Sequence, residues 1–151
     1  MVAINRILIP LTALLIGLGP AVHGQASTLT SKQLAYFDSL FRMVGDPAQE
    51  TSTLQRREGV IIGRFALDPA EGGALHAAAV QYFAFALQAN ESLRSVSEGK
   101  TELSASERAA ISTIAAKRSA AISQLATSFL GKLKPEAASR IITFISKERQ
   151  Q

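Results

Sequence analysis

The feature that most constrains the fold is a long segment, residues 69–98, whose apolar side chains repeat at helical spacing. One stripe consists of Leu75, Ala78, Ala79, Tyr82, Ala86, Ala89 and Leu93, and Val80, Phe83 and Leu87 widen it. Asp68 followed by Pro69 is a favoured helix start, and Gly99 ends the segment. A helix that is apolar over more than half of its circumference needs neighbours on several sides. We therefore expect it to be the central helix of a bundle.

Two further helices are predicted before this segment. Residues 31–44 follow Thr30 or Ser31 as the N-cap and end at Gly45, and their apolar face consists of Leu34, Phe37, Leu40, Phe41 and Val44. Residues 49–67 form a weaker helix, with Leu54, Ile61, Ile62 and Phe65 on its apolar side. Gly59 and Gly63 lower its helix propensity, but two glycines four residues apart also let another helix approach closely.

Two helices are predicted after the central segment. Ser104 and Glu107 have the spacing of a capping box, with Leu103 in the position of a hydrophobic staple, so a helix should run from residue 105 to about 130. Its expected inner face consists of Ile111, Ile114, Ala115, Ile122, Leu125, Ala126 and Phe129. A last helix begins at Pro135 and carries Ala138, Ile141, Ile142, Phe144 and Ile145. The fold class is therefore all-α, a small antiparallel up-and-down bundle of four to five helices with short connections.

The first residues have the pattern of a cleavable signal peptide. Arg6 precedes the uncharged apolar run at residues 7–18, and Gly19 and Pro20 follow it. This run is shorter than the roughly 20 residues that a membrane-spanning helix needs. Cleavage after Gly24 or after Ala26 fits the preference for small residues. We expect residues 1–26 to be the signal peptide and residues 27–151 to be one helical domain; an N-terminal core helix or an uncleaved anchor is the alternative.

The chain has no cysteine, so it is expected to carry no disulfide and no lipidated cysteine. The predicted location is the periplasm or the outside of the cell, without a stable membrane anchor. The net charge of +4 becomes +3 when Arg6 leaves, which is too small a surplus to indicate nucleic-acid binding. Residues 117–151 hold 7 basic and 2 acidic side chains. This basic end could touch an anionic surface, although a solvated face is the simpler interpretation.

Catalytic and cofactor patterns are not found in the sequence. His76 is the single histidine after the expected signal peptide, and it is interpreted as a packing or surface residue. The glycines form neither a Walker loop nor a G-x-G-x-x-G motif, so nucleotide binding is not indicated. The carboxylates lack the paired spacing of a glycosidase or a di-iron bundle. We expect no enzyme activity, no catalytic residue, no metal and no cofactor.

Arg118 is the one candidate site residue. It lies seven residues after Ile111 and seven before Leu125, near the centre of an apolar helix face. A buried arginine needs a carboxylate or carbonyl groups around it. Either its stem lies along the core while its head reaches an acid on a neighbouring helix, or it binds an anion or a partner in a groove between helices.

Two helix starts of the chain show a resemblance to a known family. The segments Leu103-Ser104-Ala105-Ser106-Glu107 and Leu133-Lys134-Pro135-Glu136-Ala137 resemble the L-T-x-x-Q repeats of the Spy/CpxP-type periplasmic helical chaperones. The match covers about a third of the chain, with Ser104 and Lys134 in place of Thr and with Glu107 and Ala137 in place of Gln. The chain is also loosely similar to small secreted helical proteins of bacteria, and no functional residue is carried over from either group.

The leading hypothesis is a non-enzymatic, chaperone-like or other binding protein of the bacterial envelope. Its partner would be a protein client or an envelope component, held by an apolar groove or by the basic C-terminal face. The alternative is a structural bundle that associates with copies of itself. A contiguous exposed apolar patch would favour the binding protein, and a self-complementary patch would favour self-association.

Overall fold

Five helices make up the described structure, a computed structural model in which residues 28–147 are described. They are α1 (Ser31–Gly45), α2 (Thr51–Phe65), α3 (Pro69–Ser97), α4 (Ala105–Leu130) and α5 (Pro135–Lys147). The predicted all-α bundle and its helix boundaries are confirmed. The expected signal peptide at residues 1–26 lies outside the described residues. Within residues 28–147 no helix is both long and apolar enough to cross a membrane.

Three helices begin with a reciprocal capping box, which explains why their first residues could be predicted from the sequence. In α3 the Asp68 carboxylate accepts a hydrogen bond from Glu71 N at 2.9 Å, while Glu71 Oε2 accepts one from Asp68 N at 2.8 Å. Thr30 with Gln33 and Ser104 with Glu107 form the same arrangement in α1 and α4. Each box satisfies two backbone donors that a helix start leaves unpaired, and all its atoms come from residues three apart.

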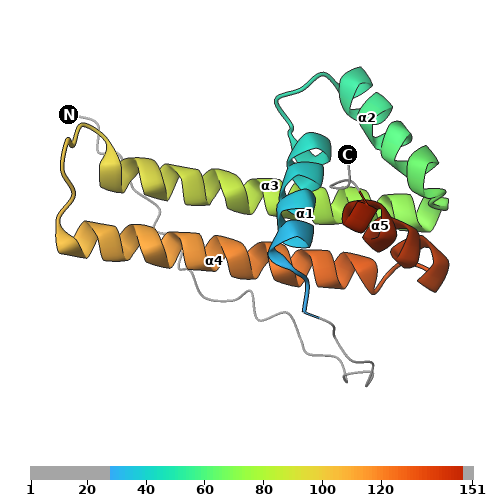
Figure 1. Cartoon of the computed structure of the whole chain (residues 1–151). Helices are drawn as coiled ribbons and strands as arrows, with labels where there is room; N and C mark the ends of the chain where they lie inside the picture. Colours follow the sequence, from blue (N-terminus) through green and yellow to red (C-terminus); the bar gives the residue numbers. More distant parts are fainter. Residues whose placement is uncertain (1–27, 148–151) are drawn as a thin grey trace, which may run out of the picture.

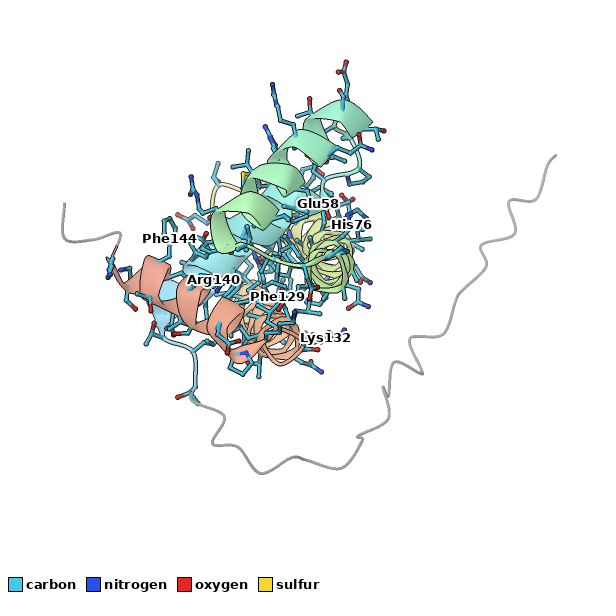
Figure 2. The ribbon with its side chains drawn as sticks, turned by 90° about the vertical axis from the view of Figure 1, so that its right-hand side faces the viewer. Glu58, His76, Phe129, Lys132, Arg140 and Phe144 are labelled. Atoms are coloured by element: carbon cyan, nitrogen blue, oxygen red, sulfur yellow. The ribbon has the colours of Figure 1, made fainter. Side chains whose placement is uncertain are left out.

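The helices are not all aligned with one another. The antiparallel pair α3 and α4 forms a long hairpin, and α1 lies across it at a steep angle (Figure 1). The shorter helices α2 and α5 lie at the end of the hairpin where α3 begins and α4 ends, and they stand in front of α1 when the hairpin is viewed end-on (Figure 2). The architecture is a bundle, but the up-and-down order applies only to α3 and α4.

An aromatic cluster holds α1 onto the hairpin. Phe37 and Phe41 of α1 meet Tyr82 of α3 and Phe129 of α4, with ring centroids 5.7 to 6.2 Å apart. All four side chains are fully buried. Large aromatic rings contribute more apolar burial than most side chains, and tilted or edge-on contacts are their preferred geometry. The core is therefore centred on the crossing of α1 over α3 and α4.

Burial along α4 differs from the predicted inner face. Ile122, Ala126 and Phe129 are buried, but Ile111, Ile114 and Leu125 are only partly buried and Ala115 is exposed. The physical reason is the position of α1, which covers the C-terminal half of α4 and leaves the other half with α3 as its main neighbour (Figure 1). A two-helix hairpin cannot bury a whole apolar face.

The glycine pair of α2 also differs from its predicted role. A Cβ built on Gly59 or Gly63 would meet nothing within 4 Å. No helix of residues 28–147 therefore approaches α2 at these glycines.

Candidate functional site

Arg118 lies in the middle of α4, where α1 crosses the hairpin. Its Nη2 donates a hydrogen bond to Asp38 Oδ1 of α1 at 3.0 Å, and its Nε donates one to the Tyr82 hydroxyl of α3 at 3.3 Å. About 30% of the side chain is exposed. The stem thus lies along the core and the head reaches an acid on a neighbouring helix, which is the first of the two arrangements considered from the sequence.

Asp38 is the centre of a four-residue polar group, which we name the Asp38 cluster: Asp38, Arg42, Tyr82 and Arg118. Arg42 Nε lies 3.1 Å from Asp38 Oδ2, and the Tyr82 hydroxyl donates a hydrogen bond to Oδ1. Burial raises the pKa of Tyr82, and the Asp38 carboxylate raises it further, so the hydroxyl stays a neutral donor at physiological pH. Two arginines against one aspartate leave the cluster with a formal charge of +1.

Sequence reasoning missed three of these four residues. Tyr82 was assigned to the apolar stripe, and its ring is indeed buried while its hydroxyl is used by the cluster. Asp38 and Arg42 have the i, i+4 spacing of a helical ion pair, which is the one local signal for them. The contact between Asp38 and Arg118 joins residues 80 positions apart, so no local pattern could indicate it.

The Asp38 cluster borders a groove of about 320 Å³ between α1, α3 and α4, which we name the Arg118 groove. Its polar lining consists of Asp38, Tyr82 and Arg118 together with Ser31 and Ser119. Leu34, Leu93, Ile114 and Ile122 provide aliphatic walls. Concave sites with mostly apolar walls and a few convergent polar groups are the usual form of small-molecule sites. The groove is thus suited to a ligand that is apolar along most of its length and polar at one point.

A second groove, of about 300 Å³, follows the outer side of α3, and we name it the α3 groove. Val80, Phe83 and Leu87 of α3 line it, with Leu54 of α2 and Val44 of α1. Val80 is 46% exposed and Leu87 is 53% exposed. These are the residues that widened the apolar arc in the sequence. The sequence had led us to expect other helices to cover these residues, but no element of residues 28–147 does so.

His76 lies at the edge of the α3 groove as a surface residue. Its Nδ1 is 3.4 Å from Glu58 Oε2 of α2, and 54% of the side chain is exposed (Figure 2). This placement agrees with the packing or surface role predicted for it. Residues 28–147 contain no group of three or more histidine, cysteine, aspartate or glutamate side chains that could hold a metal ion.

Three of the basic side chains after residue 116 make contacts with other groups of the same chain. Arg118 belongs to the Asp38 cluster, and Lys134 Nζ lies 2.9 Å from Asp68 Oδ2, a contact that raises the pKa of Lys134. Arg140 donates to the backbone carbonyls of Phe65 at 2.9 Å and Ala66 at 3.2 Å, where α2 ends (Figure 2). Part of the positive charge of the basic end is therefore engaged in contacts within the molecule.

No family model, curated protein or solved structure gives a significant match to this chain.

Proposed function

We propose that this protein is an exported, non-enzymatic binding protein of the bacterial envelope that holds an apolar segment of a partner polypeptide in the α3 groove. The observation that carries the proposal is the exposure of a second apolar face on α3. Val80, Phe83 and Leu87 stand at positions i, i+3 and i+7, the spacing with which a helix packs against another helix. Val80 and Leu87 are exposed and Phe83 is half-buried between them, and an apolar helix face of this kind is suited to binding an apolar segment.

The surroundings of the α3 groove support a polypeptide partner. Leu54 and Val44 add aliphatic side chains from α2 and α1, so three elements contribute to the groove. Glu58 and His76 stand at its side and offer polar groups to the rim of an interface. An apolar centre with a polar rim is the common composition of protein interfaces.

The test measures how the protein affects aggregation of a chemically unfolded client. The full-length chain is expressed with residues 1–26 and purified in the form the cell leaves it. We expect it to slow aggregation, and the double variant Val80→Gln, Leu87→Gln to lose most of this effect. Val60→Gln is the matched control, because Val60 is 54% exposed on α2 and does not line the groove.

Several outcomes would contradict the proposal. A protein that neither slows aggregation nor retains an envelope component in a pull-down is not a binding protein of this kind. If ultracentrifugation shows a dimer that the double variant abolishes, and the protein does not slow client aggregation, the hypothesis of a self-associating bundle is correct. An N-terminus in cells that is still Met1 would contradict export.

A further inference from the structure

We propose that the Arg118 groove binds an alkyl carboxylate, a ligand of the fatty-acid class with one anionic end and an aliphatic chain. The inference does not depend on the proposed function, because the Arg118 groove and the α3 groove share no lining residue.

The Asp38 cluster contains more hydrogen-bond donors than acceptors. A guanidinium carries five N–H groups. Within the described residues, the hydrogen bonds of Arg118 use Nε and Nη2, and Nη1 remains for another acceptor. Arg42 Nη2 is also without a hydrogen-bond partner among these residues, but it is buried and Arg42 does not line the groove, so Arg118 is the arginine that a ligand in the groove can contact. A carboxylate brings acceptors only, so it matches this surplus.

The charge of the cluster indicates a monoanion. Arg42 and Arg118 carry two positive charges, and Asp38 is the single acidic residue that lines the groove. One added carboxylate neutralises the remaining charge of +1, and arginine forms its strongest hydrogen bonds with such groups. A cationic ligand would be repelled by the net positive charge of the cluster, and a dianion would exceed that charge.

The walls of the groove indicate the rest of the ligand. Leu34, Leu93, Ile114 and Ile122 come from three helices and face the same space. Ile122 is buried, and the other three are partly buried. An aliphatic chain placed along these side chains would remove apolar surface from water, which is favourable in proportion to the area covered. A small anion without a chain would gain nothing from the walls.

Calorimetric titration of the full-length chain, purified in the form the cell leaves it, tests the proposal. The probes are decanoate below its micelle-forming concentration, decanol as the neutral equivalent, decyltrimethylammonium as the cationic one, and acetate as the carboxylate without a chain. We expect decanoate to bind and the other three to bind much more weakly or not at all. Equal binding of decanol and decanoate would overturn the proposal, as would the absence of decanoate binding.

Two charge-matched variants locate the carboxylate. Arg118→Met should weaken decanoate binding by about tenfold or more, the scale of a lost charge-assisted hydrogen bond. Lys117→Met removes the same charge one residue away, from an exposed side chain that does not line the groove, and should bind decanoate like the unmodified protein. Equal binding by Arg118→Met and Lys117→Met would overturn the assignment.

A variant that is expected to gain affinity separates loss of binding from loss of folding. Asp38 competes with the ligand for Arg118, so Asp38→Asn should bind decanoate several-fold more tightly even if the variant is less stable. Weaker binding by a folded Asp38→Asn protein, verified by circular dichroism, would contradict the proposal. The Val80→Gln, Leu87→Gln variant should keep decanoate binding, so a failure of either site is distinguishable from a failure of the other.

Discussion

Gly45 lies directly against the backbone of Ala79, where α1 crosses α3. A Cβ atom built on Gly45 would stand 2.2 Å from the Ala79 carbonyl oxygen and 2.5 Å from its carbonyl carbon. Both residues are buried, and backbone atoms cannot move aside as a flexible side chain can. From the sequence Gly45 was assigned to the end of the first helix. The structure shows that its missing side chain also lets α1 approach α3.

The Gly45 contact predicts that Gly45→Ala destabilises the protein. We expect the free energy of unfolding to fall by about 1–3 kcal/mol, as for other overpacked sites, because the added methyl group must push the two helices apart. Urea unfolding followed by circular dichroism measures the change. Gly59→Ala is the control: its Cβ meets nothing, and alanine in a helix interior should add roughly 0.5–1 kcal/mol. Equal effects of the two variants would contradict this view of Gly45.

Glu71 predicts a second stability effect. This buried carboxylate accepts hydrogen bonds from Asp68 N at 2.8 Å and from Lys134 N at 2.7 Å, and so ties the start of α3 to the segment before α5. Glu71→Gln keeps the shape but turns an amide donor toward a backbone donor. We expect the free energy of unfolding, measured by thermal unfolding, to fall by about 1–3 kcal/mol. Glu91→Gln, at an exposed position of the same helix, should change stability little.

Glu107 predicts an acid-sensitive start of α4. Hydrogen bonds from Lys100 and from Ser104 N lower the pKa of Glu107 from 4.5 to about 2. A lowered pKa in the folded state stabilises the protein above the unfolded value and loses this effect as pH falls through the folded value. The difference in unfolding free energy between the unmodified protein and Glu107→Gln should therefore be constant above pH 5 and shrink from about pH 4.5 to about pH 2. A difference that does not vary with pH would contradict the stabilising role of ionised Glu107.

Tyr82 predicts the opposite dependence at alkaline pH. Its pKa is raised above 10.0 in the folded state, so folding favours the neutral hydroxyl. This contribution is complete below the unfolded value and is lost as pH rises toward the folded one. Denaturant unfolding from about pH 8 upward should show a decline in stability above pH 10 that is smaller in Tyr82→Phe. At neutral pH the variant should lose about 0.5–1.5 kcal/mol for the hydrogen bond to Asp38. An identical alkaline decline in both proteins would refute the role of Tyr82.

The candidate site was predictable only in part. The helical repeat identified Arg118 as a candidate, because it places this charged residue on an otherwise apolar helix face. Its partners Asp38 and Tyr82 were not predictable, because α1, α3 and α4 come together only through the crossing. Val80 and Leu87 illustrate the reverse error: their spacing indicated a buried face, and the described residues leave this face open.

The sequence by itself determined the helices and their boundaries. Capping boxes, Pro69 and Pro135 at helix starts and the 3.6-residue repeat are local features, so their physics acts between residues a few positions apart. Only the tertiary structure decided how α1 crosses the hairpin, because that depends on the Gly45–Ala79 approach and on aromatic packing between distant residues. The two grooves follow from that crossing and from the limited cover that α2 and α5 give to α3. A pattern along one helix cannot say which of its faces the other helices will cover.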